Sequence, residues 1–204
     1  MEVKLRALKS IQRQIETVNG QENPYDSRDF VMATESQNAL LVNQTEGVAD
    51  LAICLQAKLL EEFGERHYPS DFRLEDFPSL SVLVEELSHF NYFVEKTRLN
   101  QQIRPLDLEI QSEVDKFSFA LSCLQGSGQE FQDEIFELLF DQIRLGDWVD
   151  EQERARYHDA HQIARSFCRA VLNESSCFDD QRSLFQAFFS LTPQEKRRWK
   201  SVAL

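Results

Sequence analysis

Two short histidine motifs carry the residue types that could bind a metal ion. Glu86-Leu-Ser-His89 has the Glu-x-x-His spacing that places a carboxylate and an imidazole on one helix face in di-iron bundles. Such sites need a second copy of the motif and two further glutamates, and the sequence contains no second copy. We therefore predict that His89 lies at the surface or is partly buried, and that it binds no metal.

The second motif, His158-Asp-Ala-His161, places two histidines about one helical turn apart, which could begin a metal site. His161, however, follows the same helical stripe as Tyr157, Ala164 and Cys168. This position favours packing over coordination. The sequence thus predicts no metal site here either.

The four cysteines show no metal-binding or redox spacing. Cys54, Cys123 and Cys168 lie in apolar helical stripes, and no CxxC or CxH pair occurs. Together with Cys177 they are typical of free thiols in a reducing compartment. No base partner for a cysteine nucleophile is identifiable, and glycine-rich phosphate loops and the Gly-x-Ser-x-Gly elbow are missing. We predict a protein without enzymatic activity and without a cofactor, with a helical metal-carboxylate enzyme as the weakest alternative.

A basic cluster near the end of the sequence is the candidate contact surface. A capping box, Thr192-Pro193-Gln194-Glu195, predicts the start of a short helix. The residues that follow are predicted to bind RNA or an acidic partner: Lys196, Arg197, Arg198, Trp199 and Lys200. The alternative is a solvated basic helix end that merely favours the helix dipole.

These basic residues stand out because the chain as a whole is acidic. The 204 residues have a formal net charge of −13. Residues 1–20 carry +2 and residues 150–204 carry +1, whereas residues 21–149 carry −16. A field of this sign repels nucleic acid and anionic membranes. With 42% hydrophobic residues the chain can bury a core, and no apolar stretch long enough to span a membrane is present.

Long segments with apolar residues three and four apart predict that nearly the whole chain is helical. The predicted helices are 2–18, 36–66, 79–101, 105–125, 129–145, 150–173, 178–190 and one from Thr192. Short connections favour an antiparallel helical bundle. We predict an all-α fold, with a bundle over residues 1–125 and a C-terminal helical segment over residues 126–204.

The stretch "IRPLDLEIQSEVDK" illustrates how these helices begin. Pro105 stands at the first helical position, and Asp107 and Glu109 follow near the positive end of the dipole. We expect Leu106 to anchor the helix on its buried seam and Asp107 to face solvent. Sixteen phenylalanines predict either a phenylalanine-rich core or a contact surface for a partner.

Four segments, taken in order, resemble the helical domain of neuroguidin and its relatives among the small-subunit processome and nuclear exosome-cofactor proteins. They are "NALLVNQTEGVADLAICLQAKLL", "LSVLVEELSHFNYFVEKTR", "IRPLDLEIQSEVDK" and "FQAFFSLTPQEKRRWKSV". In the third segment the residues that match the family motif are Arg104, Pro105, Leu106, Asp115 and Lys116.

The resemblance implies a non-enzymatic nucleolar factor of ribosome biogenesis. Such a protein would belong to the U3 snoRNP of the small-subunit processome and act in pre-rRNA processing. Its expected partners are processome proteins, with pre-rRNA or U3 snoRNA as further candidates, and no membrane or small-molecule substrate is implied. Relatives carry lysines where this chain has Asp107 and Glu109, which favours protein partners over direct RNA contact. The alternative is a stand-alone acidic helical binding protein, of inhibitor or immunity type, that covers a basic partner surface and resides in the cytoplasm.

Overall fold

A computed structural model of the chain describes residues 5–45, 48–126, 128–142 and 151–199. In chain order the elements are α1 (Arg6–Asn19), the 3-10 helix η1 (Ser27–Phe30), β1 (Val31–Thr34), β2 (Ala39–Thr45), β3 (Val48–Gln56), α2 (Ala57–Phe63), the 3-10 helix η2 (Leu74–Asp76), α3 (Phe77–Arg98), α4 (Pro105–Cys123), α5 (Gln129–Phe140), α6 (Glu151–Glu174), α7 (Phe178–Ser190) and α8 (Pro193–Arg197). The mostly helical class is confirmed, whereas the all-α prediction is wrong because a small sheet is present.

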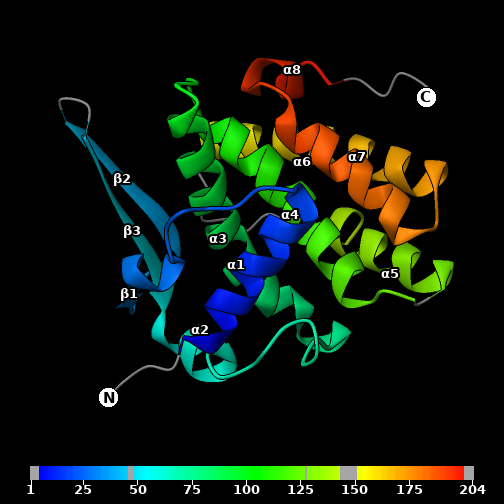
Figure 1. Cartoon of the computed structure of the whole chain (residues 1–204), viewed down its shortest axis with the longest axis horizontal. Helices are drawn as coiled ribbons and strands as arrows, with labels where there is room; N and C mark the ends of the chain where they lie inside the picture. Colours follow the sequence, from blue (N-terminus) through cyan, green and yellow to red (C-terminus); the bar gives the residue numbers. More distant parts are fainter. Residues whose placement is uncertain (1–4, 46–47, 127, 143–150, 200–204) are drawn as a thin grey trace.

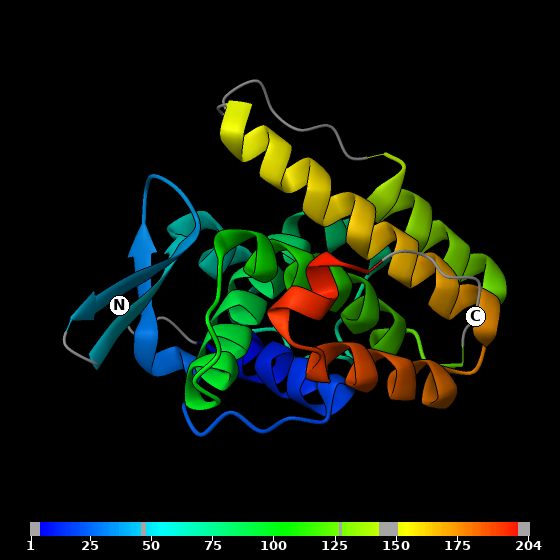
Figure 2. The ribbon, with the colours of Figure 1, turned by 90° about the horizontal axis from the view of Figure 1, so that it is seen from above.

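The sheet replaces most of the helix that was predicted over residues 36–66. Its strand order is β1–β3–β2, with β1 parallel and β2 antiparallel to β3. Apolar residues in this region satisfy both helical and alternating spacing, and the alternating set, with Ile53 and Leu55 buried, prevails. Only α2 forms a helix there. Figure 1 shows the β2–β3 hairpin projecting beyond the helices, and Figure 2 places the sheet at one end of the molecule.

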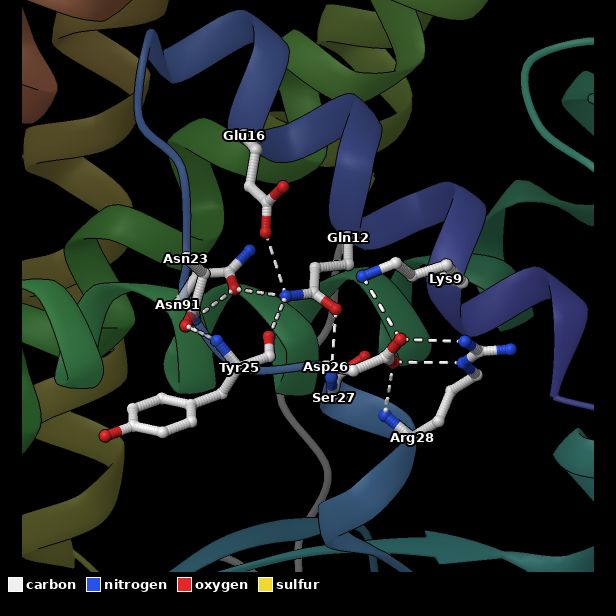
Figure 3. A network of polar contacts seen from close by, with 9 residues as sticks. All are labelled: Lys9, Gln12, Glu16, Asn23, Tyr25, Asp26, Ser27, Arg28 and Asn91. Atoms are coloured by element: carbon white, nitrogen blue, oxygen red, sulfur yellow. Dashed lines mark hydrogen bonds and ion pairs between the residues drawn. The ribbon is translucent and has the colours of Figure 1, made fainter.

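Helix α1 ends where the Asn19-Gly20 signal predicts. Gly20 has a φ of 65°, in the left-handed region that glycine tolerates, and its N–H donates to the carbonyl of Glu16. The buried Gln12 side chain then holds the following polar segment: its Nε2 donates to the carbonyl of Tyr25 at 2.8 Å, and its Oε1 accepts from the N–H of Ser27 at 2.9 Å (Figure 3). This anchor positions η1, which leads directly into the sheet.

Helix α4 lies at the centre of the helical part. It contacts α1, α3, α5, α6, α7 and α8 (Figure 1). Its start at Pro105 and its end before Gly126 agree with the sequence prediction. Unlike an ordinary amphipathic helix, it buries polar as well as apolar residues: Asp107, Glu109, Gln111, Ser112, Asp115, Lys116, Ser118 and Ser122.

One hydrophobic core draws on both proposed segments of the chain, from Ala7 to Phe188. The division at residue 125 and the antiparallel bundle arrangement therefore remain predictions. Phenylalanines form much of this core; for example, Phe117 packs edge-on against Phe136 and Phe167 stacks on Phe188 at 4.1 Å between ring centroids. The interpretation of a phenylalanine-rich core is confirmed for these residues. No helix among the described residues is long and apolar enough to cross a membrane.

The four cysteines differ more in solvent exposure than their positions in apolar stretches of the sequence predict. Cys168 is buried, Cys54 and Cys123 are half-buried, and Cys177 is exposed; all four are free thiols. Burial raises the pKa of Cys168, and it raises the pKa of Cys123 to about 12. Both thiols are thereby disfavoured as nucleophiles.

We expect one rapidly reacting thiol in the native protein. Cys177 should react first with a maleimide, and Cys168 should react only in denaturant, because the thiolate must be both formed and accessible. Mass spectrometry of labelled peptides over time measures this order. In a Cys177→Ser variant the fast phase should disappear; its persistence would show that another thiol is exposed.

Candidate functional site

The basic end of the chain is largely internal. Lys196 is 0% exposed, and its Nζ donates to Gln111 Oε1 and lies 4.3 Å from the centroid of the Tyr92 ring. Arg197 is half-buried and is paired with the fully buried Asp107. The prediction that Lys196 and Arg197 form an exposed contact surface is therefore wrong, as is the prediction that Asp107 faces solvent.

The remaining residues of that predicted surface have separate positions. Arg198 is exposed, whereas Trp199 is half-buried and packs edge-on against Phe167 and Phe188. Lys200 lies outside the described residues. Among the described residues of this basic cluster, Arg198 is thus the one that can contribute an exposed cation to a contact surface.

The amino group of Lys196 belongs to a polar network centred on α4. Asp115 accepts hydrogen bonds from Asn19 on α1 at 2.9 Å, from Ser88 on α3 at 2.6 Å and from Gln111 at 2.7 Å. Gln111 in turn accepts from Lys196. Burial lowers the pKa of Lys196, reinforced by nearby Lys96, while Asp115 acts in the opposite direction. The network fastens α8 to the centre of the fold.

The residues of the family motif have structural positions around the same helix. Arg104 precedes α4 and its N–H donates to Asp107 Oδ2 at 2.7 Å, which caps the helix start that Pro105 opens. Leu106 is half-buried, and Asp115 and Lys116 are buried. Asp115 and Lys116 thus serve the interior contacts of α4, whereas Arg104 and Pro105 are exposed at its start.

A second polar cluster lies between α3, α4 and α6, and we name it the α3–α4–α6 cluster. Glu85, Glu86 and His89 come from α3, Glu109, Glu113 and Lys116 from α4, and Arg156 and His161 from α6. Ion pairs join residues from all three helices. The sequence singled out Glu86, His89 and His161, but their partners across the interface carry no signal in the linear sequence.

His89 lies at the centre of this cluster. It is 7% exposed, so the prediction of a surface or partly buried histidine is wrong. Its Nδ1 lies 3.6 Å from Glu86 Oε2, and its Nε2 lies 3.6 Å from Glu109 Oε2. Burial opposes protonation, but the two carboxylates outweigh it and raise the pKa of His89 to about 10. Without another cation, the imidazole is held as a positive charge between them.

Lys116 joins the other half of the cluster. Its Nζ lies 3.0 Å from Glu85 Oε2 and 2.6 Å from Glu113 Oε1, and His161 Nδ1 lies 3.8 Å from Glu113 Oε2. Burial of Glu113 favours its neutral form, but Lys116 and His161 prevail and lower its pKa to about 2. His161 also contacts the Phe140 carbonyl through Nε2 at 3.0 Å, so the predicted packing role is accompanied by polar contacts.

Comparisons with protein families, with curated proteins and with solved structures found no match to this chain. The class of protein is therefore argued from the arrangement of its residues. One of the four segments behind the family resemblance also differs in form: residues 39–45 and 48–56 form two strands, where the family pattern implies a long helix. The segments at α3, α4 and α8 are helical as expected.

Lys196→Glu should lower the free energy of unfolding by roughly 3–5 kcal/mol, because it buries a new negative charge beside Asp115. The matched control is Arg198→Glu, which changes an exposed cation two residues further along the chain and should be nearly neutral. Urea denaturation of both variants measures the difference. Equal losses of stability would contradict the buried position of Lys196.

The ion pairs of Glu113 predict a particular acid sensitivity. Its folded-state pKa of about 2 lies below its ordinary value of 4.5, so its stabilising contribution is complete above about pH 4.5 and is lost as the pH falls toward 2. Glu113→Gln should therefore be less stable than the wild type near neutral pH, and this difference should shrink in acid. Urea denaturation across that range tests it, with the exposed Glu134→Gln as control. A difference that stays constant with pH would refute the assignment.

Proposed function

We propose that the chain is a non-enzymatic binding protein whose contact surface is the outward face of the β1–β3–β2 sheet. The observation that carries this proposal is the exposure of large apolar side chains there. Met32 is 58% exposed, Leu41 51% and Val48 66%. Exposed apolar groups gathered on one face are typical of a protein–protein interface.

The strand register supports the common orientation of these side chains. Met32 pairs with Cys54 and Leu41 pairs with Ala52, so all four point to one face. Val48 lies an even number of residues from Ala52 on the same strand and shares that face. Ile53 and Leu55 point to the opposite face and are buried in the core. The outward face also carries the Asn43–Asp50 pair, so its exposed apolar side chains are flanked by polar ones, as in a protein interface with a polar rim.

Charge indicates the kind of partner. Residues 29–57 contain no lysine or arginine. Their described acids, Asp29, Glu35 and Asp50, are exposed. Two lysines of the helical part, Lys116 and Lys196, are buried. A partner protein with an apolar centre and a rim of lysine and arginine complements this surface. This is the acidic binding protein that the sequence left as the alternative.

The edge strand β2 offers a further means of attachment. It pairs with β3 on one side only, and its residues, Ala39–Thr45, include no charged residue and no proline. Charged residues and proline protect edge strands from pairing with another chain, and β2 lacks both. An extended segment of the partner can therefore add to the sheet at β2 while its side chains contact the apolar face.

The family resemblance supports a more specific cellular role for such a binding protein. In that role the chain is a nucleolar or nuclear component of the U3 snoRNP and its partners are other processome proteins. The helical segments at α3, α4 and α8 support it, whereas the strands at residues 39–45 and 48–56 and the internal Lys196 do not. RNA contact through Lys196 is not part of the proposal.

Affinity purification of the tagged full chain from its own cells tests the proposal. We expect a stoichiometric basic partner, and recovery of processome proteins with U3 RNA would favour the more specific role. A double variant, Met32→Asp with Leu41→Asp, should reduce recovery at least about tenfold, because two apolar anchors are lost. The control is Phe131→Asp, which changes an apolar residue on α5 that is 47% exposed. Undiminished recovery of the same proteins by the folded double variant would exclude the sheet face.

A further inference from the structure

We propose that Glu85, His89 and Glu109 form a binding site for one divalent transition-metal ion of the Zn²⁺ class. Ligand atoms of these three residues all lie within 4.8 Å of one another, and they form the one such group among the described residues. Imidazole nitrogen and carboxylate oxygen are both accepted ligands of Zn²⁺. The site is separate from the sheet face and does not depend on the proposed function.

The helices place these three ligands with little freedom. Glu85 and His89 are four residues apart on α3, so their side chains lie on the same helix face. Glu109 reaches them from α4, which packs against α3. Two ligands about 2 Å from a tetrahedral metal are about 3.3 Å apart. The 3.6 Å between His89 Nε2 and Glu109 Oε2 is close to this value, and a carboxylate oxygen of Glu85 lies within 4.8 Å of the other two ligands.

The state of His89 provides an independent observation that points to a ligand. His89 is more than nine-tenths buried, yet its Nε2 makes no hydrogen bond to any described residue. That nitrogen points toward Glu109, one of the proposed ligands. A buried polar atom without a hydrogen bond is costly and requires an explanation. A metal ion bound by Nε2 would provide one.

Glu86 is placed as an outer residue that supports this coordination. Its Oε2 lies 3.6 Å from His89 Nδ1 and is likewise buried without a hydrogen bond to the described residues. Imidazoles that bind metal through one nitrogen usually donate the other N–H to a carboxylate, which fixes the tautomer and the ring orientation. Glu86 occupies the position of that carboxylate. The Glu-x-x-His spacing thus provides an orienting residue and a ligand rather than two ligands.

The charges of the α3–α4–α6 cluster also fit a divalent cation. Four carboxylates, those of Glu85, Glu86, Glu109 and Glu113, surround two permanent cations, Lys116 and Arg156. The carboxylates outnumber these cations by two, so a divalent ion that replaces the proton of His89 fits the charge of the site. Lys116 contacts Glu85 Oε2 and Arg156 lies nearest Glu109 Oε1, which leaves Glu85 Oε1 and Glu109 Oε2 for the metal. The Glu85 side chain is 26% exposed and provides a path from solvent.

Metal binding to the full-length protein tests the site directly. After treatment with a chelator, the protein is dialysed against Zn²⁺ or, separately, Mn²⁺, and the retained metal is measured by mass spectrometry. We expect one retained Zn²⁺ per chain and a rise in Tm on adding Zn²⁺, because the ion binds the folded state. With Co²⁺ in place of Zn²⁺, the absorption spectrum should show nitrogen and oxygen ligands and no thiolate charge-transfer band, which excludes the cysteines.

Variants separate this site from adventitious binding. His89→Gln and Glu109→Gln should lose the retained ion and the rise in Tm, and Glu85→Gln, at the more exposed ligand, should weaken binding if the two buried variants fail to fold. His158→Gln is the control, because His158 is an exposed histidine outside the cluster. The proposal is overturned if the wild type retains no metal, or if folded Glu85→Gln and His89→Gln retain as much as the wild type.

Discussion

Helix α4 is buried on nearly all sides although it carries five charged residues, and these residues must therefore find partners inside the fold. Its polar residues fall into two groups along the helix. Asp107, Gln111 and Asp115 are four residues apart and follow one face, while Glu109 and Glu113 follow another. Each group is met by side chains from different elements. The positions of α3, α6 and α8 depend on these contacts as well as on apolar packing.

The two groups give the fold its two internal polar networks. Asp107 is paired with Arg197, and Asp115 accepts hydrogen bonds from Asn19 and Ser88. These contacts attach α8, α1 and α3 to α4. Glu109 and Glu113 face His89, His161 and Arg156 from α3 and α6. Because these basic side chains pair with acids inside the fold, they contribute little positive charge to the molecular surface. The surface is therefore more acidic than the basic cluster near the end of the sequence suggests. This redistribution of charge underlies the choice of a basic partner.

Binding and metal coordination use different parts of the molecule. The apolar sheet face lies at one end, on strands that project from the helices (Figure 2). The α3–α4–α6 cluster lies within the helical part; His89 and Glu109 are buried there, whereas Glu85, Arg156 and His161 are partly exposed. A metal ion there would link α3 to α4 and stabilise the scaffold that carries the sheet. The two features can therefore be tested independently.

The sequence by itself determined most helices, because their start and stop signals are local. The bounds of α4 and α7, the Gly20 end of α1 and the capping box at Thr192 follow from residues within one or two turns of chain. Residues 39–45 and 48–56 could not be assigned in this way, since their apolar spacing fits a helix and a strand alike, and the pairing of β3 with β1 and β2 decides between them. The burial of Lys196 and His89 likewise depends on α4, which is distant in the sequence. Charge and residue type are local properties, whereas burial and the identity of a partner are properties of packing, and only the tertiary structure supplies them.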